Sequence, residues 1–165
     1  MKSAILRLGF LALFAFSAIG CSAGKIAVVN PELAYRNSTS SEKGAAYLRS
    51  VGTELESELR ALEEKVNSAQ TKQQKAEAQA EMQTRVVAIQ QRFNAEQQQV
   101  LNAISEVYKK ALDTCREKLG LDLVLPNEVA LSHNPAMDIT KNVTEEMNAL
   151  PLEFKPIQAE PAAAQ

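Results

Sequence analysis

The spacing of apolar residues divides the chain into a long helical middle section and two short strand-like ends. From about Ser41 to Leu119, apolar residues recur at alternating intervals of four and three positions. A repeat of this kind places one apolar seam along a helix, against which a second helix packs as in a coiled coil. The predicted seam runs through Leu48, Gly52, Leu55, Leu59, Leu62, Val66 and Ala69, and then through Met82, Val86, Ile89, Phe93, Val100, Ile104, Val107 and Ala111.

Two interruptions of this repeat carry structural information. Between Phe93 and Val100 the seam position falls on Glu96 or Gln97. Residues 67–79 contain almost no large apolar side chain, although a continuous rod would need its seam to pass through them. The pattern therefore predicts an antiparallel helical hairpin that bends near Asn67 and Ser68. Arms of roughly 30 to 40 residues would reach about 45 to 60 Å at 1.5 Å per residue.

The segments on either side of the hairpin are β-like. Residues 25–30 are an apolar, β-branched run that ends at an Asn-Pro turn signal. Gly120 stops the long helix, and residues 121–125 and 129–131 are candidate strands. A short helix over about 141–149 follows, with Asp138 or Thr140 as its cap.

The predicted fold class is α+β, with a single domain over residues 24–150. A small β body (25–40 and 120–150) carries the helical hairpin arm (41–119), and prolines and small residues predict a disordered tail over 151–165. Three short strands make a weak independent core, so their apolar runs need covering. Self-association through a shared β core is the simplest remedy. The candidate residues of this oligomer interface are Ile26, Val28, Leu123 and Leu125.

Residues 1–23 have the order of a bacterial secretory signal peptide. Lys2 and Arg7 precede an apolar run over 8–19, which is too short for a resident membrane helix, and small residues follow. Two processing routes are open. A lipoprotein box ends before Cys21, which would then be acylated and attach the protein to a membrane. Cleavage after Ala23 would instead release a soluble protein that starts at Gly24.

Composition and charge narrow the class of function. Aromatic residues make up 5% of the chain and Trp is absent, as is typical of long helices rather than a compact globule. Of 18 basic and 20 acidic residues, two basic ones leave with the signal, so the processed chain carries a net charge near −4. Nucleic acid would require a concentrated basic face, and we expect no such partner.

The sequence offers little catalytic chemistry. His133 is the only histidine and lies in a predicted turn, and no zinc-type cluster or glycine-rich phosphate loop is present. Cys115 is the one cysteine left in the fold after processing, so an intrachain disulfide is excluded. It is interpreted as a small buried hydrophobe, with an intermolecular bridge as the alternative. We expect a protein that is not an enzyme and that holds no cofactor or metal.

Three stretches resemble the Skp/OmpH family of periplasmic chaperones. They are the first strand (25–30), the helical section rich in Gln, Glu and Ala, and the closing block of 120–125, 127–130 and 138–140 before the last helix. The resemblance implies a homotrimer with a small β-barrel body and three helical arms around a cavity. It also implies ATP-independent capture of unfolded outer-membrane β-barrel proteins in the periplasm. Candidate client contacts on the arms are Met82, Val87 and Phe93.

Two features depart from the family pattern. Members of the family are often strongly basic, whereas this chain is slightly acidic. An acyl group on Cys21 would also tether a body that is normally soluble. The alternative function is a structural coiled-coil lipoprotein of the envelope that acts as a spacer or tether. The β-like ends favour the chaperone, because a spacer needs only the heptads.

Overall fold

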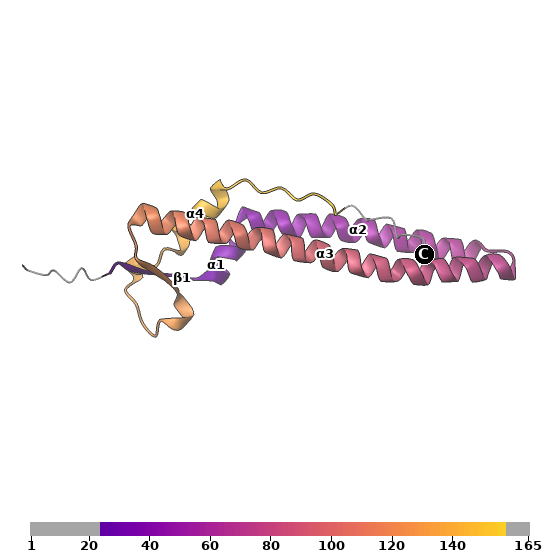
Figure 1. The fold of residues 1–165 in the computed structure, drawn as a ribbon, viewed down its shortest axis with the longest axis horizontal. Coiled ribbons are helices and arrows are strands. Elements are labelled where there is room, and N and C mark those ends of the chain that lie inside the picture. The colour runs from indigo at the N-terminus through magenta and orange to yellow at the C-terminus, as the bar shows by residue number, and fades with distance from the viewer. Residues whose placement is uncertain (1–23, 158–165) are drawn as a thin grey trace, which may run out of the picture.

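The computed structural model describes residues 24–157, and it consists of a long helical hairpin that projects from a small body (Figure 1). The signal peptide predicted over 1–23, including Cys21, and residues 158–165 lie outside the described part of the chain. The elements are β1 (Ile26–Val29), α1 (Pro31–Arg36), α2 (Thr39–Ser68), α3 (Lys72–Leu119), β2 (Leu123–Pro126), two 3₁₀ turns (Asn127–Val129 and Pro135–Met137) and α4 (Thr140–Ala149). The predicted α+β class with a helical arm is confirmed.

Local sequence signals set the ends of the two arm helices. The Ser38 hydroxyl accepts a hydrogen bond from the Ser41 amide and caps α2. At the bend, Thr71 and Gln74 form a capping box that starts α3, and only three residues lie between the end of α2 and the start of α3. Gly120 ends α3 in the left-handed region, with φ of 59°, which glycine adopts at little cost. The predicted bend near Asn67 and Ser68 is therefore displaced by one to three residues.

The two arm helices pack along the predicted seam, with three exceptions. Leu55, Leu62 and Ile89 are buried between α2 and α3, as expected. Val51 is buried where the repeat placed Gly52, and Val86 is 41% exposed although the repeat placed it inside. A straight helix drifts by about 20° per heptad against a strict repeat of 3.5 residues, which rotates some formal seam positions outward. The third exception is an exception in polarity only: Glu96, one of the two residues that the repeat offered for this position, occupies the apolar seam fully buried.

Two parallel strands form the sheet of the body. β1 pairs with β2 in the register Ile26 to Leu123 and Val29 to Pro126, so the whole hairpin is the crossover between neighbouring strands. On its other edge, β1 forms a bridge with Asp138, and the Ile139 amide donates to the Val28 carbonyl. The strand predicted over 129–131 is wrong. The chain turns through a 3₁₀ helix directly after Pro126 and leaves Leu131 fully exposed.

The core of the body lies where α3, α4 and β1 meet. Val143 and Met147 of α4 are completely buried, and Cys115 of α3 is 2% exposed in the same apolar cluster. Burial raises the pKa of the Cys115 thiol, so the reactive thiolate is disfavoured. Its environment is that of a buried hydrophobe and leaves no access for an intermolecular bridge.

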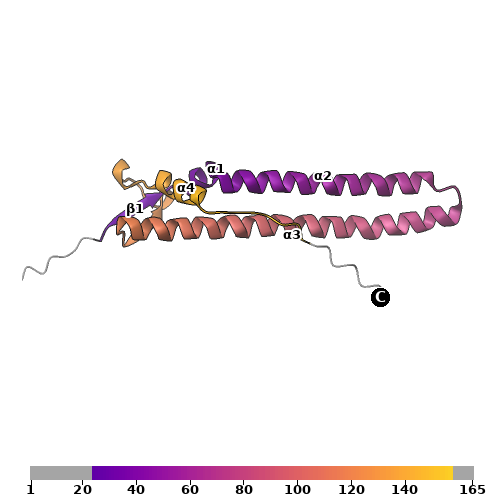
Figure 2. The same cartoon turned by 90° about the horizontal axis from the view of Figure 1, so that it is seen from above.

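The segment after α4 runs along the hairpin towards α3 (Figure 2). Part of the predicted disordered tail, residues 151–157, thus lies against the hairpin without regular secondary structure, and 158–165 lie outside the described residues. The segment is held because Leu152 and Phe154 pack on the apolar cluster that extends from the body into the base of the arm. Within residues 24–157, no helix is long and apolar enough to cross a membrane.

Candidate functional site

The candidate sites of this molecule are exposed apolar surfaces. Over residues 24–157, no three His, Cys, Asp or Glu side chains come together in a way that could hold a metal ion. His133 lies between the two 3₁₀ turns, as its predicted loop position required. The chemistry available to a partner is therefore apolar contact, hydrogen bonding and charge.

One exposed apolar surface lies on α3 near the tip of the arm, and it is called the arm patch. It consists of Met82, Val86 and Val87, of which Val86 and Val87 are 41% and 57% exposed. Together with Gln79 and Gln83, these side chains line an open hollow of about 590 Å³. Positions 82 and 86 are one turn apart, so their side chains stack along one side of the helix. The hollow is shallow and shaped by flexible side chains, which suits partners of varied sequence.

The structure brings together two of the three predicted client contacts. Met82 and Val87 both line the hollow of the arm patch. Phe93 lies about three turns beyond Met82 on α3. It is half-buried against the apolar cluster between the two helices. Phe93 does not line the hollow, whereas Met82 both lines it and packs partly against the same cluster.

Two exposed apolar residues of α3 were missed from the sequence. Val86 was assigned to the seam, and Leu101, 62% exposed, was given no role. Val86 is followed by Val87, and Leu101 is preceded by Val100, so each has an apolar residue next to it in the sequence. Consecutive residues on a helix point about 100° apart, so both members of such a pair cannot face one narrow seam. That pairing is the signal that could have identified these surface positions.

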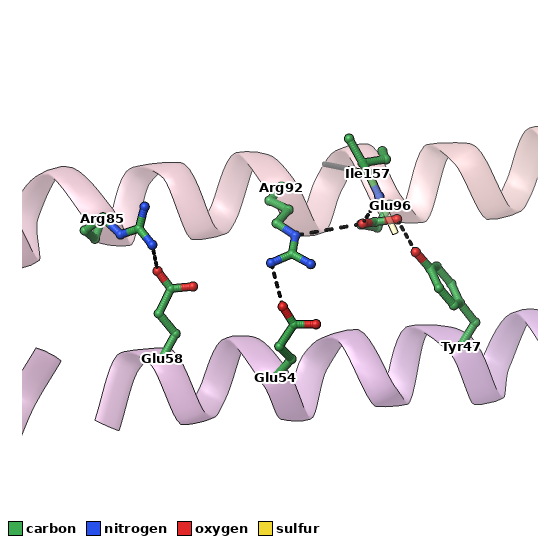
Figure 3. Close-up of polar contacts among 7 residues, drawn as sticks. All are labelled: Tyr47, Glu54, Glu58, Arg85, Arg92, Glu96 and Ile157. Carbon is green, nitrogen blue, oxygen red and sulfur yellow. Dashed lines mark hydrogen bonds and ion pairs between the residues drawn. The ribbon is translucent and has the colours of Figure 1, made fainter. Parts of the chain in front are cut away.

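Ion pairs across the hairpin fix the antiparallel register of its helices. Lys65 pairs with Glu81 at 2.5 Å. Arg92 pairs with Glu54 at 2.9 Å, and Arg85 pairs with Glu58 (Figure 3). Exposed pairs of this kind contribute only about 0 to 1 kcal/mol each. Their main effect is to favour one alignment of α2 against α3, which keeps the arm patch at a defined place.

A buried polar cluster interrupts the apolar seam at Glu96. The Tyr47 hydroxyl donates to Glu96 Oε2 at 2.7 Å, and the Ile157 amide donates to Glu96 Oε1 at 2.8 Å (Figure 3). The Arg92 Nε lies 3.9 Å from the same carboxylate. Burial, together with the hydrogen bond to Glu96, raises the pKa of Tyr47 to about 12, so this phenol is a neutral donor at physiological pH.

A second exposed apolar surface lies on the sheet of the body. Ile26 and Leu123 are register partners on adjacent strands and are 42% and 45% exposed. The other two residues predicted for an interface behave differently, since Val28 is buried and Leu125 is half-buried within the protomer. Among the described residues, β2 pairs only with β1, so its second edge carries unpaired main-chain groups. An apolar face beside an open strand edge is a site for pairing with another chain.

Comparison with known proteins gives a family match and solved structures of similar fold. The sequence profile of the family described as "Outer membrane protein (OmpH-like)" matches residues 25–147. A crystal structure from Caulobacter crescentus, of a protein provisionally described as an OmpH-like outer membrane chaperone, superimposes with a TM-score of 0.57 at 18% identity. The alignment covers 86% of this chain and 96% of that one. No curated protein matches the sequence.

Proposed function

Because the chain belongs to the OmpH-like family, we propose that it is an ATP-independent holdase chaperone that binds unfolded outer-membrane β-barrel proteins and prevents their aggregation. The observation that carries the proposal is the arm patch. Two exposed valines, Val86 and Val87, and the half-buried Met82 line an open hollow without a shaped pocket near the tip of a long arm. Unfolded β-barrel strands alternate apolar and polar residues and aggregate through their open edges. Loose apolar contacts on a projecting arm suit the binding of such segments without selecting one sequence.

The arms act together only if several chains share one body. We propose a homotrimer whose shared β-barrel is built around the edge of β2 and the exposed pair Ile26 and Leu123. This arrangement would cover about two large apolar side chains per protomer that water now contacts. It would also place three arms side by side around a common space. Several weak contacts to one client then add to a strong overall association.

The proposed location is the periplasm. The family and the predicted signal peptide over 1–23 both support export. Whether the body is soluble or tethered depends on Cys21, and the intact mass of the native protein separates the two routes. A mass equal to that of unmodified Gly24 to Gln165 indicates cleavage after Ala23. A larger mass that includes acyl chains on Cys21 indicates membrane attachment.

The role of the arm patch is tested by comparing client affinity between two matched variants, one substituted within the patch and one outside it. Val87→Ser and Leu101→Ser both remove an apolar side chain that is more than half exposed on α3. We expect Val87→Ser to weaken affinity for a urea-unfolded outer-membrane β-barrel protein about fivefold, since each buried CH₂ group is worth about 0.8 kcal/mol. The triple variant Met82→Ser, Val86→Ser, Val87→Ser should lose most protection against aggregation, as measured by light scattering after dilution from urea.

Leu101→Ser is the control, and it should stay within about twofold of the wild-type affinity because it lies outside the patch. Equal losses for Val87→Ser and Leu101→Ser would show that the patch has no special role. If the wild-type protein at near-stoichiometric amounts fails to slow client aggregation, the holdase proposal itself is wrong.

A further inference from the structure

The segment that follows α4 lies on the arm in an extended form with alternating exposure. Leu150, Leu152 and Phe154 are half-buried, whereas Pro151, Glu153 and Lys155 are exposed. The segment therefore presents one apolar side to the hairpin and one polar side to water. Strands of transmembrane β-barrels show the same alternation of apolar and polar residues. The match to the OmpH-like family ends at residue 147, so this segment lies beyond the part that the family profile describes.

The aromatic residue of this segment packs against α2, and the surface of α2 and α3 on which the segment lies is called the groove. The Phe154 ring stacks on the Tyr47 ring, with centroids 5.3 Å apart and planes 24° from parallel. Gly44 forms the floor of the groove: a Cβ atom at this position would lie 3.7 Å from Phe154 Cζ and 2.8 Å from Val100 Cγ1. The absence of a side chain at Gly44 is what allows Val100 to approach α2 this closely, whereas 3.7 Å from Phe154 is an ordinary van der Waals contact.

The remaining polar contacts of the segment are made by its main chain. The Ile157 amide donates to Glu96, Gln99 Nε2 donates to the Lys155 carbonyl at 3.0 Å, and Lys43 Nζ donates to the Leu152 carbonyl at 3.3 Å. Main-chain recognition does not depend on which side chains the bound segment carries. The groove thus requires an extended chain with an aromatic residue at one place, and little else.

Glu96 has the properties of a residue placed for binding rather than for the stability of the arm. It is fully buried in a seam that is otherwise apolar, where a well-packed apolar residue would generally stabilise the hairpin at least as well. One of its oxygens accepts a hydrogen bond from Tyr47. The other accepts a hydrogen bond from the amide of the bound segment and lies 3.9 Å from Arg92 Nε. Without a bound main chain, that oxygen would lose its hydrogen bond.

We propose that this groove, formed by Gly44, Tyr47, Glu96, Gln99 and Val100, is a second client-binding site. Its ligand is an extended segment of an unfolded outer-membrane protein in which apolar and polar residues alternate and one residue is aromatic. Residues 150–157 occupy the groove as an internal competitor and leave it when a client segment binds. The inference rests on the proposed function, since it names the segment that this chaperone would recognise.

The fraction of time for which the chain's own segment occupies the groove determines how much the apparent affinity for a competing ligand is lowered. A tethered ligand has an effective concentration of about a millimolar. A segment with an intrinsic dissociation constant of about 0.1 mM would then leave the groove open about one tenth of the time. The apparent affinity for a competing ligand falls by the same factor. Displacing the internal segment should therefore raise the apparent affinity about tenfold.

The test uses a fluorescently labelled peptide with the sequence of residues 150–157, added to the full chain and followed by fluorescence anisotropy. Phe154→Ala removes the stacked ring, and Ile157→Pro removes the amide that binds Glu96, and neither alters a residue of the groove. Both variants should bind the peptide about tenfold more tightly than the wild type. Lys155→Ala is the matched control, because its side chain is exposed and only its carbonyl is used; it should bind like the wild type.

Two further measurements locate the binding in the groove. Adding Gln99→Ala or Tyr47→Ala to Phe154→Ala should reverse the gain, while circular dichroism shows that helix content is kept. A peptide of the same composition, reordered so that the alternation is lost, should bind at least tenfold more weakly. Equal peptide affinity for the wild type, both opened variants and the groove variants would overturn the proposal, as would equal affinity for the reordered peptide.

The aggregation assay on the same samples separates this inference from the proposed function. If the opened variants suppress client aggregation but do not bind the peptide, the groove proposal fails and the holdase function stands. If they bind the peptide but no variant protects a client, the groove is a peptide-binding site, and its assignment to outer-membrane clients is wrong.

Discussion

Glu96 and Tyr47 show how far single residues could be interpreted from the sequence. The break in the repeat identified position 96 or 97 as a polar seam position before any partner was known. Its partners could not be derived, because Tyr47 is 49 residues away on α2 and Ile157 is 61 residues away after α4. Contacts at such separations depend on the hairpin register and on the path of the last segment. Neither is contained in local periodicity.

At the same scale, Tyr47→Phe tests the buried hydrogen bond. The substitution keeps the ring that stacks on Phe154 but leaves Glu96 Oε2 without its donor. We expect the free energy of unfolding to fall by about 1 to 2 kcal/mol, the usual cost of an unmet buried acceptor. Urea denaturation at fixed protein concentration measures it. Tyr108→Phe, whose hydroxyl makes no hydrogen bond within residues 24–157, should change stability by less than about 0.5 kcal/mol.

The same tyrosines predict how stability depends on alkaline pH. Burial is the main cause that raises the pKa of both Tyr47 and Tyr108 to about 12, from an ordinary value of 10.0. Between pH 10 and 12 the folded state keeps protons that the unfolded state releases. The resulting stabilisation is complete below pH 10 and is lost as pH rises to 12. Tyr47→Phe should make this decline shallower, and a decline unchanged by the substitution would contradict the assignment.

At the scale of the elements, two glycines of α2 face different surroundings. A Cβ atom at Gly44 would lie 2.8 Å from Val100 Cγ1 and 2.9 Å from Ile104 Cδ1, whereas one at Gly52 would meet nothing within 4 Å. Gly44 is therefore needed for the close approach of α3. Gly52 lies outside the seam. The strict repeat assigned Gly52 to the seam, but the residue that is buried there is its neighbour, Val51.

This difference predicts opposite effects for one and the same substitution. Gly52→Ala should raise the free energy of unfolding by about 1 kcal/mol, since alanine is the better helix former. Gly44→Ala gains the same propensity but overpacks against a stiff valine at a cost of about 1 to 3 kcal/mol. It should therefore leave the protein about 1 kcal/mol less stable in urea denaturation. A gain in stability for both variants would mean that α2 and α3 do not pack as closely as described.

Elements with a strong period were predictable, and those that depend on a partner were not. The long helices and the bend follow from spacing and caps, which act locally. The final helix was also predicted, but its N-cap is Ile139, without a side-chain hydrogen bond, where Asp138 or Thr140 was expected. The strand expected over 129–131 failed because a strand requires a neighbour, and sequence alone does not reveal whether an edge is available. The segment at 151–157 looked like a tail because it has no helical period. Its alternating exposure becomes meaningful only beside the groove that it occupies.

At the scale of the whole molecule, the proposed function assigns assembly to the body and client binding to the arm. Leu123→Glu would place a charge at the proposed interface beside Ile26, and we expect it to convert the trimer to monomers. Light scattering measures the mass. Leu101→Glu introduces the same charge on an exposed position of the arm and should leave the trimer intact. A trimer that survives Leu123→Glu would show that the chains meet at another surface.

The most direct test of a chaperone that encloses its client is the native mass of the processed protein, alone and mixed with a urea-unfolded outer-membrane β-barrel protein. The proposed function predicts a native mass of three chains for the protein alone, and of three chains plus one client after mixing. A monomer that never acquires a client, while the client aggregates freely, would contradict it. That result would favour the coiled-coil spacer of the envelope.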